Sequence, residues 1–113
     1  MPYRIDDLYS EPDGSSSTMF PGTQAVLFPT LFGKQIDILD VRWLPSPHQR
    51  SFINREGKQV FAVFEFKHKG ESFLYSSHTG STDVCRHLER AQARGMFPLR
   101  CTPIKNGTGY NLD

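Results

Sequence analysis

The stretch from residue 59 to residue 95 constrains the fold most, because it specifies two strands and a helix in direct succession. Residues 59–67 (QVFAVFEFK) are rich in β-branched and aromatic side chains, which is typical of a strand. Residues 68–71 (HKGE) predict a turn, since glycine tolerates a positive φ, and residues 72–79 (SFLYSSHT) predict the returning strand. A β-hairpin is therefore expected here.

The first strand of this hairpin has apolar side chains on both faces. Phe61 and Val63 alternate onto one face, and four side chains share the other: Val60, Ala62, Phe64 and Phe66. A chain of 113 residues has to fill its own interior, and aromatic rings are efficient fillers. We therefore assign Phe64 and Phe66 to the core.

A helix is predicted after the hairpin, ending at Gly95. Ser81 or Thr82 can cap it, and Asp83 lies in the first turn, where the helix dipole favours an anion. One face is apolar and is expected to dock on a sheet: Val84, Leu88 and Ala91, with Cys85 and Gln92 at its edge. The far face has an arginine stripe, which we interpret as solvated: Arg86, Arg90 and Arg94.

The length predicts one domain, and the remaining composition points to a cytoplasmic protein. Cys85 and Cys101 fall in an apolar helix edge and a predicted strand, which favours reduced core thiols over a disulfide. No signal peptide and no apolar run of about 20 residues is visible, so no membrane segment is expected.

The net charge of +1 conceals an asymmetry along the chain. Residues 1–20 hold one arginine and four acidic residues, a net charge of −3. The other 93 residues hold 12 Lys+Arg and 8 Asp+Glu, a net charge of +4. An acidic leader on a mildly basic body is compatible with a protein that binds polyanions.

The charge asymmetry and a linker-like run (EPDGSSS) divide the chain into a flexible acidic arm, residues 1–24, and a domain, residues 25–113. Met19, Phe20 and Phe28 interrupt the polar composition around this boundary. They either cover a sheet edge or engage a protein partner. Residues 25–28 predict a short edge strand.

The next strand is predicted over residues 34–44 (KQIDILDVRWL), and its apolar parity switches between Ile38 and Leu39. A β-bulge or a strong bend explains such a switch. Residues 45–58 then form a loop of about 14 residues, a length that is usually functional or mobile.

The C-terminal part predicts a second hairpin from residues 99–105 and 109–112, with a turn at Asn106-Gly107. A two-residue loop at that turn would place Pro103 opposite Tyr110 in a hydrogen-bonded pair, although proline has no N–H to donate. A longer loop through Gly109, or a bulge at Pro103, is therefore expected.

This order predicts a mainly β fold with one helix between strands 3 and 4. It is the order of the five-stranded Greek-key barrel known as the OB-fold. A different small α+β roll and an SH3-like barrel are the alternatives.

Several short motifs resemble small OB-fold single-stranded DNA-binding proteins of bacteriophages and mobile elements. They are residues 33–36 (GKQI), 63–66 (VFEF), 79–81 (TGS), 88–91 (LERA) and 97–99 (FPL), and Tyr110. The resemblance covers residues 33–113 and implies a role in DNA replication, recombination or repair. The chain departs from the bacterial housekeeping type because its acidic segment is N-terminal, which puts partner docking through a C-terminal tip in doubt.

Single-strand binding needs aromatic rings for stacking and cations along the phosphate path. In an OB-fold both lie on the face of strands 2 and 3 and in the loops between strands 1–2 and 4–5. The candidates at those places are Trp43, Arg50, Phe52, Arg55, Lys58, Phe61, Lys67, Phe73, Tyr75, Lys105 and Tyr110. Any single phenylalanine among them also has the alternative role of core filler.

The residue spacing gives little support for catalysis or metal binding. Cys85 and His87 are two apart on a helix and point to different faces, so they are a poor zinc pair with His78 and Cys101. Ser77 and His78 alternate across a strand, and no nucleophile elbow, Walker loop or GxGxxG motif is present. We therefore expect no enzyme activity, no metal and no cofactor.

Two functions follow from these patterns. The first is non-catalytic, sequence-independent binding of single-stranded DNA, with RNA as the alternative ligand. The second is a phage-type adaptor or inhibitor that binds a host protein through Met19, Phe20 and Phe28. The sequence is also compatible with a homo-oligomer.

Overall fold

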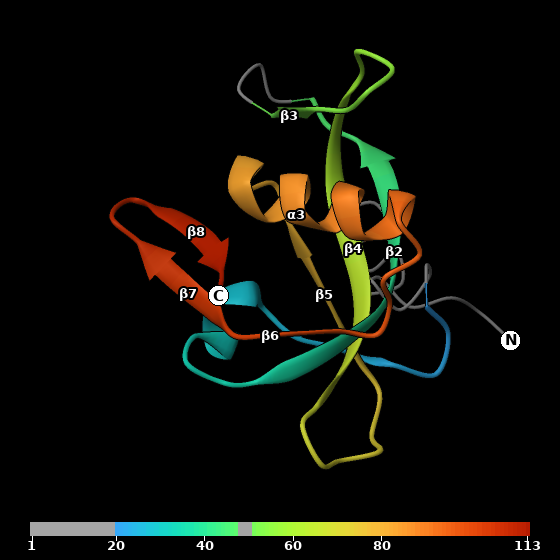
Figure 1. The fold of residues 1–113 in the computed structure, drawn as a ribbon, viewed down its shortest axis with the longest axis vertical. Coiled ribbons are helices and arrows are strands. Elements are labelled where there is room, and N and C mark those ends of the chain that lie inside the picture. The colour runs from blue at the N-terminus through green and yellow to red at the C-terminus, as the bar shows by residue number, and fades with distance from the viewer. Residues whose placement is uncertain (1–19, 48–50) are drawn as a thin grey trace, which may run out of the picture.

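The computed structural model describes residues 20–47 and 51–113, which fold around one long antiparallel strand pair. The elements are β1 (Gln24–Ala25), η1 (Phe28–Leu31), β2 (Ile36–Pro45), β3 (Phe52–Ile53), β4 (Gln59–His68), β5 (Tyr75–Thr79), α3 (Thr82–Ala93), β6 (Leu99–Cys101), β7 (Pro103–Asn106) and β8 (Gly109–Leu112). In Figure 1, α3 crosses one face of the sheet, and the β7–β8 hairpin projects to its side.

The main sheet has the order β1-β5-β4-β2-β6, with β3 added to β4, while β7 and β8 form a separate two-stranded sheet. The predicted mainly β class with one helix after the central hairpin is confirmed, but the sheet is not closed into a barrel. The edge of β5 is taken by β1, which pairs parallel to it at Gln24↔Tyr75 and Ala25↔Ser76. Among the described residues, β8 pairs only with β7, so it does not close the sheet.

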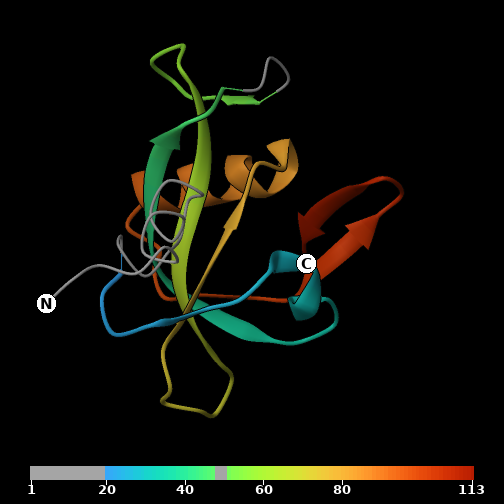
Figure 2. The same ribbon diagram turned by 180° about the vertical axis from the view of Figure 1, so that it is seen from behind.

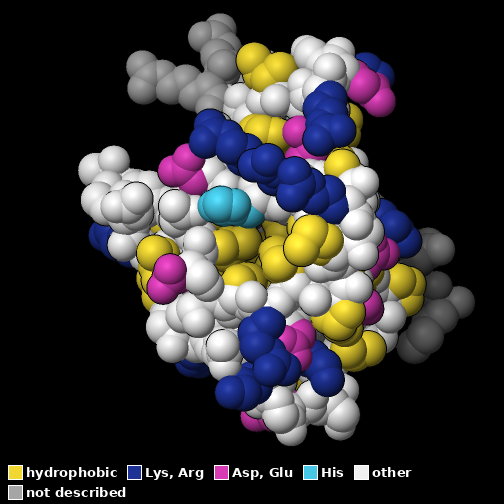
Figure 3. Space-filling model, in the orientation of Figure 1, with side chains coloured by type: hydrophobic (Ala, Val, Ile, Leu, Met, Phe, Trp, Pro, Cys, Tyr) yellow, Lys and Arg dark blue, Asp and Glu magenta, His cyan; other side chains and the backbone are white. Residues whose placement is uncertain are grey.

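The predicted core face of β4 is confirmed. Val60, Ala62, Phe64 and Phe66 are all buried and pack with Val84, Cys85 and Leu88 of α3. The helix buries this face because its apolar residues recur three and four positions apart. Its opposite face presents the arginine stripe, which Figure 3 shows as a line of basic side chains over α3.

The bulge predicted near Ile38 is present. The pairing of β2 with β4 shifts register between Ile38 and Asp40. The extra residue restores the apolar parity, so that Ile36, Ile38 and Val41 are all fully buried. The first half of β2 pairs with both β4 and β6, whereas the half after the bulge pairs with β4.

The ends of α3 match the sequence prediction. The Ser81 hydroxyl accepts a hydrogen bond from the Val84 N–H. At the C-terminus, the Met96 N–H donates to Ala91 O, the Gly95 N–H donates to Gln92 O, and Gly95 has φ +63°. These bonds form a Schellman motif, which uses glycine because it adopts a left-handed conformation without strain.

The short edge strand predicted at residues 25–28 is only partly present. Strand β1 ends at Ala25, and the chain turns into the 3-10 helix η1 at Phe28. Pro29 lies at the start of this helix and has no N–H for a sheet ladder. Figure 2 shows this segment passing across the end of the sheet to η1.

The second strand of the central hairpin begins at Tyr75 rather than at residue 72. Residues 69–74 form a loop, with Gly70 at φ +82°. Within that loop, the Leu74 carbonyl accepts a hydrogen bond from the Gln24 N–H of β1 instead of joining the ladder with β4. Phe73 and Leu74 are therefore loop residues.

The C-terminal hairpin has a two-residue loop one position after Asn106-Gly107, so the expectation of a longer loop or of a bulge at Pro103 was wrong. Asn106 pairs with Gly109, which leaves Gly107 and Thr108 in the loop. This register pairs Pro103 with Leu112, next to the Thr102–Asp113 pair, whose backbone groups exchange both hydrogen bonds. Hydrogen-bonded and non-hydrogen-bonded pairs alternate along an antiparallel ladder. Pro103 is therefore in a non-hydrogen-bonded pair, which needs no N–H. Neither a longer loop nor a bulge is needed.

We expect Phe64→Ala to lower the free energy of unfolding by about 3–5 kcal/mol, because it opens a cavity in the core. Phe61→Ala, on the partly exposed face of the same strand, is the matched control and should cost less than half as much. Urea unfolding followed by circular dichroism measures both changes. Equal losses would contradict the assigned parity of β4.

Candidate nucleic-acid interface

An aromatic cluster lies at the end of the β4–β5 hairpin. The Tyr75 ring stacks on Phe66, with centroids 5.6 Å apart and planes 21° apart. The Phe73 ring lies 4.9 Å from Tyr75, and the His68 ring meets Tyr75 edge-on at 5.2 Å. Phe66 is fully buried, whereas Phe73 is 55% exposed, so the cluster runs from the core to the surface.

The strand register explains why these rings meet. Phe66 and His68 have the same parity on β4, and Phe66 is the direct cross-strand partner of Tyr75. Phe73 precedes Tyr75 by two residues and continues the same face into the loop. Leu74, which is 37% exposed, adds a second apolar side chain at the surface.

Two lysines, Lys67 and Lys69, lie next to this aromatic cluster along the chain, and a third, Lys34, is brought near Lys69 by the fold. Lys67 is on β4 opposite Asp37, and the Lys69 N–H donates to the carbonyl of Gln35, the residue after Lys34. None of the three forms an ion pair with a carboxylate of the described residues. We call Lys67, His68, Lys69, Phe73, Leu74 and Tyr75 the hairpin-end surface.

Asp37 is the acidic group nearest these lysines in the sheet, and it is already paired. The Arg100 guanidinium on β6 donates from Nε to Oδ1 at 2.8 Å and from a terminal nitrogen to Oδ2 at 3.1 Å. This bidentate contact is the main reason that the pKa of Asp37 is lowered, and the charges of Lys67 and Lys69 lower it further. The carboxylate therefore stays ionised at neutral pH.

Trp43 does not lie at this surface. It is half-buried against the core, its ring stacks on Phe52 at 5.8 Å, and its Nε1–H donates to Gln92 Oε1 on α3. The polar atom that made it a candidate for a wet surface is thus used by the helix. Phe52 is itself buried in β3, opposite Val60, so the predicted loop over residues 45–58 contains a strand.

The predicted cations around β3 are apart from the hairpin end. Arg55 contacts Glu89 of α3 through both its backbone N–H and its guanidinium, and Lys58 pairs with Glu56. Both lie beside the start of β4, whereas the hairpin-end surface is at its other end. Arg50 lies outside the described residues.

Three further candidates are also placed elsewhere. Phe61 is on the opposite face of β4, where its ring meets His78 edge-on at 6.3 Å. Tyr110 packs against Phe28, with ring centroids 5.4 Å apart, and Lys105 is exposed on β7. Of the eleven predicted binding residues, the structure thus brings Phe73 and Tyr75 together, while Lys67 lies at the same end of β4 with its side chain on the face of Phe61.

The apolar residues predicted for a partner are used inside the fold where they can be described. Phe28 is buried and contacts Phe64 edge-on at 6.1 Å. Phe20 is also buried, with the Arg42 guanidinium 5.7 Å above its ring. Met19 lies outside the described residues, as does the predicted arm up to it. Covering the sheet, the first of the two roles considered for these residues, accounts for both phenylalanines.

His68, Lys69 and Leu74 are the members of this surface that the sequence reasoning missed. Residues 68–71 were interpreted only as a turn, and residues 72–74 as part of a strand. The run FLY, three large side chains shortly after a glycine turn that histidine and lysine precede, is a signal in the sequence that could have indicated this surface.

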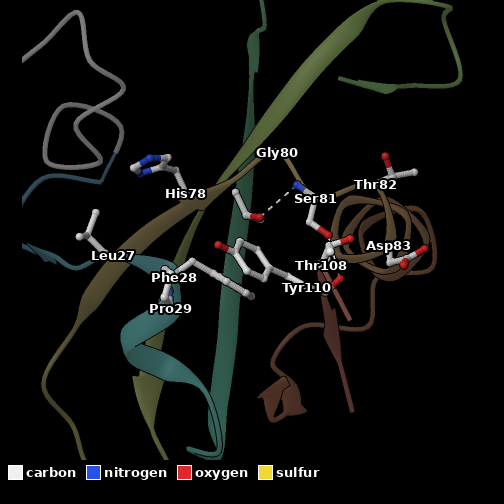
Figure 4. A pocket seen from close by; sticks show the side chains of 12 residues that line it. Leu27, Phe28, Pro29, His78, Gly80, Ser81, Thr82, Asp83, Thr108 and Tyr110 are labelled. Carbon is white, nitrogen blue, oxygen red and sulfur yellow. Dashed lines mark hydrogen bonds between the residues drawn. The ribbon is translucent and has the colours of Figure 1, made fainter. Parts of the chain in front are cut away.

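A hollow of about 800 Å³ lies at the N-terminus of α3, between η1 and the β7–β8 hairpin. Figure 4 shows His78, Asp83 and Tyr110 around it. The Ser81 hydroxyl donates to Tyr110 O, and the Ser81 N–H donates to Thr79 Oγ1, so both groups serve the fold. No hydrogen bond couples His78 to a hydroxyl among the described residues that line this hollow.

Residues 20–47 and 51–113 contain no group of three or more His, Cys, Asp or Glu side chains placed to hold a metal ion. Ser77, considered above with His78, has a buried hydroxyl with no hydrogen-bond partner and lies on the opposite face of β5. Within the same residues, no helix has both the length and the apolar character needed to cross a bilayer.

Comparisons of the chain with protein-family profiles, with curated proteins and with solved structures give no match. The geometry of the described residues is therefore the basis for assigning a function.

We expect the Asp37–Arg100 pair to make stability sensitive to acid. Because the pKa of Asp37 is lower in the folded chain than its ordinary value of 3.8, the ionised pair stabilises the fold above that value. The contribution is lost as the pH falls through the folded pKa. Asp37→Asn should therefore reduce the drop in urea midpoint between about pH 6 and about pH 2.5. Arg100→Gln should reduce this drop in the same way. If the drop in urea midpoint is unchanged in both variants, the Asp37–Arg100 pair is not a source of acid sensitivity.

Both cysteines are free and buried, and burial raises the pKa of each thiol to about 12. Since the thiolate is the reactive form, we expect neither cysteine to react with a disulfide reagent at about pH 8 while the chain is folded. Both should react in urea. A thiol that titrates rapidly in the folded protein would show that Cys85 or Cys101 is more accessible than the structure indicates.

Proposed function

We propose that this protein binds single-stranded nucleic acid without catalysis, with single-stranded DNA as the primary ligand. The single observation that carries the proposal is the half-exposed Phe73 ring, held against Tyr75 beside lysines that have no acidic partner among the described residues. Stacking platforms combined with free cations are the two components of sequence-independent single-strand binding.

The rigidity of the ring cluster supports this role. Tyr75 is fixed by Phe66 and His68, and it in turn supports the exposed Phe73. A base that stacks on Phe73 would meet a ring already restrained on one side, so less side-chain entropy is lost on binding. Lys67 and Lys69 flank His68 on the chain, so both cations lie at the same end of the β4–β5 hairpin as Phe73.

The strand order supports an OB-like relationship. Strands β2, β4 and β5 correspond to the first three strands of that fold, α3 follows the third, and β2 pairs with β6 as well as with β4. In this correspondence β4 and β5 are strands 2 and 3, which form the ligand face of OB-folds. The hairpin-end surface lies at the turn between them.

Titration of a fluorescent oligo-dT at two salt concentrations tests the proposal. We expect micromolar or tighter binding at low salt, weakening as salt rises. Phe73→Ala should cost about 1–3 kcal/mol of binding free energy, the usual value of one stacked base. Lys69→Ala should reduce the slope of log K against log salt by about 0.7, the value of one single-strand phosphate contact.

Two matched variants serve as controls at the opposite end of β4. Ile53→Ala removes an apolar side chain as exposed as Phe73, at 58%, and Lys58→Ala removes a lysine that pairs with Glu56. Both should bind oligo-dT like the unmodified protein. Undetectable binding at low salt, or equal losses of oligo-dT affinity in the Phe73 and Ile53 variants, would refute the proposal. Competition with duplex DNA and with RNA shows which ligand is preferred.

A further inference from the structure

A groove runs between the C-terminal half of α3 and the strands β6 and β8, with a volume of about 400 Å³. Its floor includes Leu99 and Leu112, both only partly buried, and Met96 at its edge is 53% exposed. Figure 3 shows this floor as an apolar strip between two groups of basic side chains. We call it the arginine groove.

Three arginines border the arginine groove: Arg90 and Arg94 on α3, and Arg100 on β6. Arg90 and Arg94 have no ion-pair partner among the described residues, whereas Arg100 is shared with Asp37. The other titratable groups in its lining are Asp113, His87 and the buried thiol of Cys101, and His87 is hydrogen-bonded to Asn111. The Arg and Asp side chains that line the groove sum to a net charge of +2, or +1 when Asp37, the partner of Arg100, is included.

An apolar floor with a positive border is complementary to an acidic segment that carries apolar side chains. Residues 3–13 of this chain (YRIDDLYSEPD) have that composition. Four carboxylates, at Asp6, Asp7, Glu11 and Asp13, are interleaved with Ile5 and Leu8. The segment has a net charge of −3, opposite in sign to that of the groove.

The groove is also within reach of this segment. Residue 20 is fixed because the Phe20 ring packs under Arg42 of β2. Arg42 is on the face of β2 opposite to Val41 and α3, so the segment has to pass round the edge of β2 after the bulge, where the Val41 carbonyl accepts a hydrogen bond from Gln92 in the last turn of α3. Residues 14–19 can span about 20 Å when extended, roughly twice the diameter of a helix.

We propose that residues 3–13 dock in the arginine groove of their own chain, with the carboxylates at Arg90 and Arg94 and the apolar side chains on Leu99 and Leu112. Two other occupants fit the groove less well. A second copy docked groove to groove would bring arginines against arginines. A single nucleic-acid strand would find no Phe, Tyr or Trp ring to stack on among the residues that line the groove.

A spin label on the full chain tests this docking directly. Ser10→Cys places one reactive thiol in the acidic segment, while Cys85 and Cys101 are buried and remain unlabelled. With the label oxidised, the amide signals of Met96, Leu99 and Leu112 should lose most of their intensity in a ¹H–¹⁵N spectrum. Reduction of the label should restore them. Full intensity in both states would overturn the proposal.

Charge reversal supplies the matched controls. Arg90→Glu with Arg94→Glu should restore the groove signals in the labelled protein, since the like charges repel the acidic segment. Arg86→Glu makes the same change on the same helix outside the groove, where Arg86 pairs with Asp83, and should leave the signal loss unchanged. Signal loss that persists in the double variant would refute the ionic docking.

Mixed samples distinguish the other occupants. Labelled ¹⁴N protein added to unlabelled ¹⁵N protein should leave the groove signals at full intensity; if they weaken, the segment docks between chains and the proposed docking within one chain is wrong. Added oligo-dT that restores the groove signals in the Phe73→Ala variant would show that nucleic acid takes the groove instead. Neither outcome depends on binding at the hairpin-end surface.

Discussion

The antiparallel pairing of β2 with β4 is the interaction on which the rest of the structure depends. Nine residue pairs join the two strands, and both are central in the main sheet. Every other strand of that sheet is attached to one of them, either directly or through β5. The buried face they share, with Ile36, Ile38 and Val41 opposite Phe64 and Phe66, is also the surface on which α3 packs. Hydrophobic burial along this pair is thus the main source of stability.

The bulge after Ile38 gives the two halves of β2 different surroundings. Before it, β2 lies between β4 and β6, and Asp37 on the outer side is held by Arg100. After it, the free side of β2 is partly covered by Gln92, which contacts both Trp43 and the Val41 carbonyl. The bulge therefore lies between two ends of the sheet. One end has the hairpin-end surface, and at the other end Gln92 of α3 is hydrogen-bonded to β2.

The sequence predicted the local structure well where one pattern dominated. The parity of β4, both ends of α3 and the bulge in β2 followed from apolar spacing and from capping residues. Barrel closure could not be predicted, because it depends on whether β1 or β8 pairs with the edge of β5. The strength of pairing between two distant strands depends on both strands and their surroundings, so neither strand alone indicates it. The positions of Trp43 and Phe52, away from Phe73 and Tyr75, could not be predicted for a related reason. Trp43 and Phe52 are in contact only because β3 folds back onto β4, and a loop of 14 residues gave no sign of it.

The parallel pairing of β1 with β5 has a consequence for the order of folding. Gln24 pairs with Tyr75, so fifty residues intervene between the two partners, whereas the β4–β5 hairpin closes over a short loop. Contacts that are distant in sequence incur a larger loop-closure entropy and form late. During synthesis β1 leaves the ribosome well before its partner, and the buried Phe20 and Phe28 that flank it stay exposed until the hairpin is made. The nascent chain therefore passes through a stage in which two aromatic rings of the finished fold face water.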